Sequence, residues 1–432
     1  MQLHLIRRLL AVAVLALAVP AVAQANSVTQ WNKAALDTLV AFPAPAGGAA
    51  QALQLDMAMT QGAVYDAVNA IEPRHRPYLL CTPFVPTASK DAAAATAAYR
   101  VLSNIVSTVP ATIAFPNRAA LLTSLSDTYA ASLAAVPDGA SKDAGVAAGT
   151  AAANAMLAAR ANDGRFGPSP WVSNTSPGHW QPLLNPDGSR QLDPAAWVAN
   201  VKPFLLRSPS QFRTDGPNDL GSKAYAADVN ETEALGSVSS SVRTAEQTHN
   251  AIFWQTAGGP AWLWNGAARG LVDSRGLDLG DSALLFAELN LAAADASISV
   301  WNDKYHFDFW RPWQAIRGAD LDDNPATTAD PTWTALITAP YPEHPSGHVG
   351  LDSAYLETLR TFFGTKKLTL DVTSSRFPGE TRTFTSVKEP LKEVIEARIW
   401  AGLHFRTADM QSKKLGRDVA RYMAKHYFQP LN

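Results

Sequence analysis

Three short segments in the C-terminal third of the 432-residue chain carry the residue types that anion chemistry needs. In one of them, Pro345 is followed by Ser346, Gly347 and His348, and a helical pattern begins at about residues 347–349. Serine is a common N-cap residue, and a helix N-terminus directs free backbone N–H groups and the positive end of the helix dipole at one point. We therefore expect Ser346 and Gly347 to bind an oxyanion, with His348 beside them as a proton carrier. The alternative is an ordinary N-cap followed by a surface histidine, without any ligand, which fits the same four residues equally well.

A second segment, residues 301–312, contains two cations on an otherwise aromatic and apolar stretch. Lys304 and Arg311 are seven residues apart, which on one continuous helix would place both on one face together with Trp301. Pro312 is expected to end or kink this helix. Cations on an apolar face are costly unless an anion meets them, so the segment predicts anion binding; side chains that reach out to solvent are the alternative.

The third segment places Arg398 and His404 six residues apart, on either side of Gly402. On a continuous helix the two side chains would diverge by about 120°, whereas a break at Gly402 could turn both inward. Alone, the pair fits a structural histidine better than a functional one. Together, the three segments supply three cations, a helix N-terminus and two histidines, and this set predicts a site for a multiply charged tetrahedral oxyanion.

The order Lys-x6-Arg-Pro, Pro-Ser-Gly-His and Arg-x5-His resembles the three-part signature of the vanadium-dependent haloperoxidases. The related type 2 phosphatidic acid phosphatases and bacterial acid phosphatases share this signature. Looser likeness to the exported bacterial branch of the haloperoxidases occurs at NSVTQWNKAALD, YDAVNAI and PGHWQP, so the resemblance covers most of the chain. It implies a helical bundle of the haloperoxidase and acid-phosphatase type.

The resemblance also implies a role for each matching residue. His404 would bond to vanadium or phosphorus, and His348 would be the acid and base. Trp301 and Tyr341 would line a halide pocket. The groups that hold the oxygens of vanadate, or of phosphate at the same site, would be Lys304, Arg311, Ser346, Gly347 and Arg398.

One position departs from the family pattern. Ala408 stands where the phosphatases commonly place an Asp, four residues after the nucleophilic histidine. The residue that orients His404 is therefore open, with Asp409 and Asp295 as the candidates.

Three functions fit these residues. The first is a vanadate-dependent haloperoxidase that oxidises halide with hydrogen peroxide to hypohalous acid. The second is a soluble exported acid phosphatase or phosphoesterase of the same superfamily, which uses a phosphohistidine intermediate. The third is a non-catalytic oxyanion-binding protein, which would have no use for two histidines in these roles. The length, the aromatic-rich loops and Trp301 favour the haloperoxidase, and hydrogen peroxide, halide or a phosphate ester would be the small-molecule substrate.

The rest of the chain must position this site. Residues 26–432 are expected to form a single all-α domain of bundled helices, with the active-site portion at about 281–428. A Pro-, Gly- and Ser-rich texture predicts a long ordered loop region from 165 to about 241, and a short β-like patch lies between 368 and 386. Apolar residues at three- and four-residue spacing predict helices at 51–72, 89–109, 141–164, 242–255, 280–312 and 349–364, and two pieces at 391–428.

The N-terminus and the charge limit the location and the partners. Residues 1–25 combine Arg7 and Arg8, an apolar run and small residues typical of a secretory signal peptide cleaved after Ala23 or Ala25. The net charge of −2 predicts no nucleic-acid partner. We expect a periplasmic or secreted protein that has no membrane span after signal cleavage. The oligomeric state is open.

Overall fold

The structure is a computed structural model that describes residues 26–431. The predicted signal peptide lies outside the described residues. The described chain is mostly helical, as predicted, with one antiparallel pair of strands, β1 Leu370–Thr373 and β2 Thr381–Phe384. Its α-helices are α1 Ser27–Val40, α2 Ala50–Asn69, α3 Lys90–Thr108, α4 Arg118–Ala134, α5 Ala140–Ala159, α6 Lys223–Gly236, α7 Ala245–Phe253, α8 Gly259–Arg275, α9 Leu279–Phe307, α10 Pro312–Arg317, α11 Gly347–Phe362, α12 Lys388–Trp400 and α13 Arg406–His426. Short 3-10 helices lie at Ala44–Ala46, Ala196–Asn200 and Ala319–Leu321.

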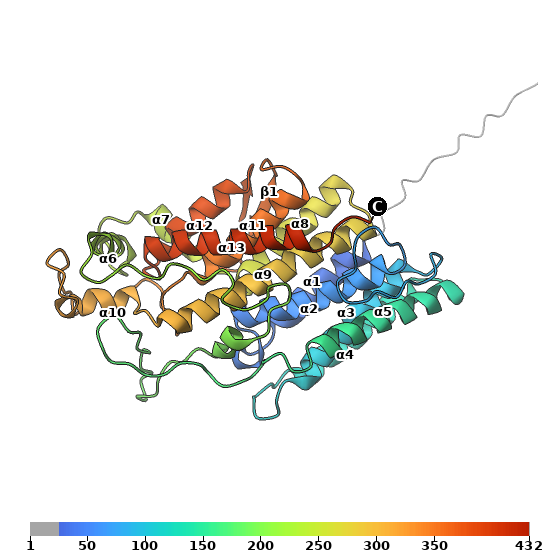
Figure 1. Ribbon diagram of the computed structural model, residues 1–432, viewed down its shortest axis with the longest axis horizontal. Helices are drawn as coiled ribbons and strands as arrows, with labels where there is room; N and C mark the ends of the chain where they lie inside the picture. The colour runs from blue at the N-terminus through green and yellow to red at the C-terminus, as the bar shows by residue number, and fades with distance from the viewer. Residues whose placement is uncertain (1–25, 432) are drawn as a thin grey trace, which may run out of the picture.

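Helix α9 is the central element of the bundle. In Figure 1 it runs between the blue and cyan helices α1 to α5 and the red helices α11 to α13, and it contacts α2, α11 and α13. Alanine and leucine occupy 11 of its 29 positions, and almost every residue from Ser282 to Lys304 is buried, as expected for a core helix. The largest apolar cluster joins both halves of the chain, from Val28 to Phe428. The C-terminal end of α9 thus places Lys304 where the loops and the C-terminal helices meet.

The same helix has the dimensions of a membrane span. By length and composition alone, α9 is the one helix in the described part of the chain that could cross a membrane. Of its most apolar window, 94% is buried inside the fold, and a core helix passes the same test.

Asp295, in the middle of α9, has a structural role. Its two carboxylate oxygens accept the backbone N–H groups of Phe204, Leu205 and Leu206 at 2.6–2.7 Å. Burial raises its pKa to about 6, although these N–H groups oppose the shift. The expectation that Asp295 is a candidate for orienting His404 is therefore wrong, because its oxygens hold the loop that follows residue 200.

Replacing Asp295 by Asn is expected to lower the free energy of unfolding by about 3 kcal/mol, because an amide N–H2 would face backbone donors. Urea unfolding measures this change. Asp127→Asn, at an exposed position of α4, is the matched control and should stay within about 0.5 kcal/mol of the wild type. An unchanged urea midpoint for Asp295→Asn would show that the loop does not depend on these three hydrogen bonds.

Two expectations about the elements require correction. The region 165–241 is not loop throughout, because α6 forms within it, with the Ser222 side chain capping the Tyr225 N–H. Helix α9 also ends before Pro312: Asp308 adopts the left-handed conformation, with φ 47°, and stops the helix. Lys304 and Arg311 therefore do not lie on one continuous helix.

Candidate active site

Lys304 lies in the last turn of α9 and is fully buried. Its ammonium donates to the carbonyl oxygens of Pro342, Glu343 and Pro345 at 3.1, 2.9 and 2.5 Å. Burial and the nearby Arg311 hold its pKa well below the ordinary value. An ammonium has three N–H groups, so the three carbonyls offset much of the free-energy cost of burying the Lys304 charge. An anion bound beside Lys304 would compete with these carbonyls for the same N–H groups.

Arg311 reaches the same backbone segment from the N-cap of α10. Its guanidinium donates to the carbonyls of Tyr341 at 2.8 Å and Pro342 at 3.2 Å, and to that of Leu403 at 2.7 Å. Pro342 O therefore accepts from both Arg311 and Lys304. The turn at residue 308, rather than a shared helix face, brings the two cations together. Both cations fix the backbone that leads into α11.

The N-terminus of α11 lies where the sequence predicts it. Ser346 is the N-cap and Gly347 the first helical residue, but the Ser346 hydroxyl does not cap the helix. Its Oγ is buried and has no hydrogen-bond partner among the described residues, and the same holds for His348 Nε2. A serine that occupies an N-cap without capping can turn its hydroxyl toward a ligand at the helix end, or toward the nearby carboxylate of Asp409.

Gly347 leaves room for Trp301. A Cβ at this position would lie 3.0 and 3.1 Å from two ring carbons of Trp301, which is closer than side chains normally pack. We expect Gly347→Ala to lower the free energy of unfolding by about 1–3 kcal/mol, because the indole must move. Gly270→Ala is the matched control: it lies on α8 with nothing within 4 Å and should be neutral or slightly stabilising. Equal urea midpoints for the two variants would show that Trp301 is free to move.

Arg398, near the end of α12, approaches from the other side. It is 3% exposed, and its Nη1 donates to Gln255 Oε1 at 2.9 Å, while its Nε has no partner among the described residues. The Arg398 charge helps to lower the pKa values of Lys304, His348 and His404. Gln255 follows α7, and no motif in the sequence marks it as a site residue.

His404 occupies the loop between α12 and α13, behind the break that Gly402 makes with φ +70°. Its Nδ1 lies 2.8 Å from Glu343 Oε1, which also accepts the Phe405 N–H at 3.0 Å. With this oxygen as acceptor, the imidazole proton is on Nδ1 and Nε2 keeps its lone pair. Arg311 Nη1 lies 3.4 Å from that Nε2.

The orienting residue is thus Glu343, which sequence reasoning missed. Burial raises its pKa to about 8, with Arg311 and Lys304 opposing the shift. The expectation for Asp409 is wrong as well: both of its side-chain oxygens are buried without a hydrogen-bond partner among the described residues. The available signal was an acid that follows Pro342 and stands two residues before the Pro-Ser-Gly-His segment.

Glu343→Ala is expected to weaken vanadate binding by roughly 10–100-fold, because His404 would lose the partner that fixes its tautomer and ring orientation. Glu343→Gln should recover most of the loss, since an amide oxygen can accept the same two N–H groups. Titration calorimetry with vanadate measures both variants. Equal losses for Ala and Gln would argue against positioning by this hydrogen bond, and no loss for Ala would rule it out.

Trp301 and Tyr341 form an aromatic wall beside the cations. Their ring centroids are 5.3 Å apart, and Lys304 Nζ lies 5.7 and 5.3 Å from them. Trp301 Nε1 donates to Asp193 Oδ2 at 2.8 Å, which fixes the indole. This aromatic wall lies against the cations of the site. The arrangement is compatible with a halide pocket at Trp301 and Tyr341, which stays a prediction.

The donor set suits vanadate or phosphate. Arg311 lies 3.4 Å from the Nε2 of a neutral histidine, and the buried Lys304 and Arg398 are close enough to help burial lower its pKa. Three buried polar atoms of the site lack partners among the described residues: Ser346 Oγ, His348 Nε2 and Arg398 Nε. An oxyanion needs charge and N–H or O–H donors, and a vanadium or phosphorus centre needs one imidazole nitrogen. The residues predicted from the three segments therefore fit the group that they were expected to hold.

Comparison with known proteins agrees with this geometry. Residues 284–432 match the family model of the VCPO second helical-bundle domain. Vanadium chloroperoxidase of Curvularia inaequalis is 24% identical over 217 residues, which are 41% of this chain and 34% of that protein, so the match spans about a third of that relative.

Two solved bacterial structures are similar over nearly the whole chain. A structure described as the first bacterial vanadium-dependent iodoperoxidase has a TM-score of 0.72 and 21% identity, covering 94% of this chain and 97% of its own. A holo-type bacterial vanadium-dependent chloroperoxidase has a TM-score of 0.68 and 18% identity, covering 89% and 92%. The resemblance seen in the sequence is thereby confirmed: residues 284–432 match the second helical-bundle domain of a vanadium chloroperoxidase family model, and the chain has the fold of bacterial vanadium-dependent haloperoxidases.

Proposed function

We propose that the protein is a vanadate-dependent haloperoxidase that oxidises halide with hydrogen peroxide to hypohalous acid. The observation that carries the proposal is His404, whose Nδ1 contacts Glu343 and whose Nε2 faces Arg311 within a cluster of three buried cations. This arrangement suits a neutral imidazole ligand beside an anion. The names of the similar structures include both iodoperoxidase and chloroperoxidase, so the halide is left to the assay.

Each residue has a definite task in this proposal. When bound, vanadate supplies a Lewis acid that makes peroxide oxygen electrophilic. His404 offers its Nε2 lone pair, and Glu343 holds its proton on Nδ1. Arg398 and the N-terminus of α11 balance negative charge, and the free Ser346 hydroxyl can donate a hydrogen bond. His348 can accept and return a proton through its unpartnered Nε2.

A phosphatase is the second candidate, and the same pair of residues favours it. A histidine oriented by a carboxylate is the arrangement of an activated nucleophile, so His404 could attack phosphorus while His348 protonates the leaving oxygen. The cations would then hold the phosphate oxygens. Trp301 and Tyr341 beside the cations have no evident part in this reaction, which is why we place it second.

Paired assays on one purified sample separate the two candidates. After vanadate loading, halogenation of a phenolic dye is measured with peroxide and chloride, bromide or iodide; without vanadate, hydrolysis of p-nitrophenyl phosphate is measured. We expect vanadate-dependent halogenation that phosphate inhibits by competition. Phosphate release that vanadate inhibits, without halogenation of any substrate, would assign the protein to the phosphatases.

The location forms part of the proposal. An exported enzyme would release its oxidising product outside the cytoplasm, in the periplasm or the medium, as the features of residues 1–25 predict. Its partners would be small molecules.

A further inference from the structure

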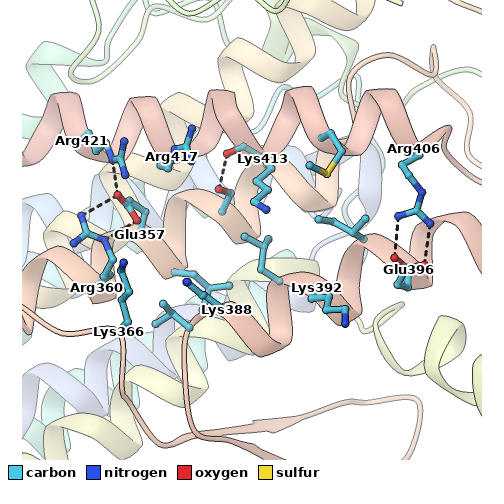
Figure 2. Close-up of a pocket in the computed structure, with 16 residues that line it drawn as sticks. Glu357, Arg360, Lys366, Lys388, Lys392, Glu396, Arg406, Lys413, Arg417 and Arg421 are labelled. Atoms are coloured by element: carbon cyan, nitrogen blue, oxygen red, sulfur yellow. Dashed lines mark hydrogen bonds and ion pairs between the residues drawn. The ribbon is translucent and has the colours of Figure 1, made fainter. Parts of the chain in front are cut away.

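A groove lies on the surface between α11, α12 and α13, and no predicted site residue lines it. Its volume is about 630 Å³. Figure 2 shows α13 along one side, with Arg406, Lys413, Arg417 and Arg421 in order, and Lys392 on the opposite side. The groove is therefore bounded by two helices, with α11 as its base.

The groove is strongly basic, although the whole chain carries a net charge of −2. Its lining includes eight Lys or Arg residues and two Glu residues, a formal net charge of +6. Both acids are already neutralised: Glu357 pairs with Arg360 and Arg421, and Glu396 pairs with Arg406. These pairs lie toward the two ends of the groove in Figure 2.

The cations between the ends are free. Lys388 and Lys392 on α12 and Lys413 on α13 have no ion-pair partner within residues 26–431. Lys388 and Lys392 are exposed, and Lys413 is half-buried. Positive charge is therefore present on both walls of the groove. A ligand with a single charged end would pair with only one wall and leave the cations of the other without a partner.

The floor between these cations is apolar. Leu356 of α11, with Leu391 and Ile395 of α12, lines it, and Met410 of α13 lies 48% exposed on its edge. Along α13 the groove extends from Arg406 to Arg421, about 22 Å at the rise of an α-helix. A ligand that fills it must be long, acidic on its flanks and apolar on one face.

We propose that this groove binds an acidic amphipathic helix of about 15 residues from a partner protein. Its apolar stripe packs on the floor formed by Leu356, Leu391 and Ile395, and its Glu or Asp residues meet Lys388, Lys392 and Lys413. The charges speed association and select acidic partners, while the apolar stripe supplies most of the affinity. The proposal does not depend on the chemistry of the candidate active site.

The probe is a fluorescein-labelled peptide of about 15 residues with leucines at helical spacing and glutamates elsewhere, followed by fluorescence anisotropy with the full chain. We expect binding that weakens with added salt, and that falls by about tenfold or more in Lys388→Glu/Lys392→Glu and in Lys413→Gln. Lys367→Glu, an exposed residue that does not line the groove, should bind like the wild type. Unchanged melting temperatures verify that the variants fold.

Control peptides test the stated chemistry. A scrambled peptide without an apolar face, polyglutamate of equal length, and the Glu-to-Gln version should each bind at least about tenfold more weakly. Equal binding of polyglutamate would overturn the proposal in favour of a general polyanion surface. An equal loss in Lys367→Glu would overturn it as well, and so would self-association in sedimentation that Lys413→Gln abolishes, because a second copy would then occupy the groove.

Discussion

His404→Ala is expected to abolish vanadate-dependent turnover, with a loss of at least roughly 10³-fold in kcat. His404 is 2% exposed, and its Nε2 is the imidazole nitrogen that Glu343 leaves with a lone pair. Alanine removes this nitrogen but keeps the three cations. Vanadate should therefore still be attracted, and its affinity should fall without disappearing. Dye halogenation and vanadate titration of the same sample measure both quantities.

The control for His404→Ala is His426→Ala. His426 is exposed near the end of α13, so the same substitution there should leave both quantities unchanged. The loss at His404 must also occur without a fall in melting temperature that would indicate unfolding at the assay temperature. Halogenation that survives in His404→Ala would contradict the proposed ligand, and the site would then lie elsewhere.

The sequence predicted the bundle because its helices are strongly periodic. Expectations for 51–72, 89–109 and 349–364 agree with α2, α3 and α11 to within a few residues. The helices α1, α4, α6, α8 and α10 were not predicted. In α6 the buried face includes Asp228 and Thr232, which lower the apolar periodicity that marks a helix. The end of α9 was placed too late because Asp308, a non-glycine residue, adopts the left-handed conformation there, and propensity does not predict such a residue.

The site was predicted as a set of residue types but not as a set of contacts. Spacing indicated that Lys304 and Arg311 act together, yet a turn between two helices brings them together, and both bind carbonyls of residues 341–345 as well as facing the site. Glu343 could not be identified as the partner of His404, because 61 residues separate them and only the fold makes them neighbours. Long-range pairs of this kind leave no periodic signal.

His348→Ala is expected to lower kcat by roughly 10²–10⁴-fold while vanadate affinity changes little. Burial and the nearby Arg398 hold the pKa of His348 well below its ordinary value, so the imidazole is neutral and able to accept a proton. Its Nε2 has no partner in the described part of the chain. A neutral side chain contributes little to holding an anion among three cations, and therefore its loss should affect proton transfer more than binding.

Comparison of His348→Ala with the wild type also decides whether the site is catalytic or only binds an oxyanion. In a protein that only binds oxyanions, the wild type would bind vanadate without halogenating the dye or hydrolysing the phosphate ester, and His348→Ala would bind equally well with nothing further to lose. His306→Ala, on the exposed side of the last turn of α9, is the matched control and should keep full turnover. A fall in affinity equal to the fall in kcat would instead make His348 a ligand of the anion, because a residue that acts only on protons leaves the binding constant unchanged.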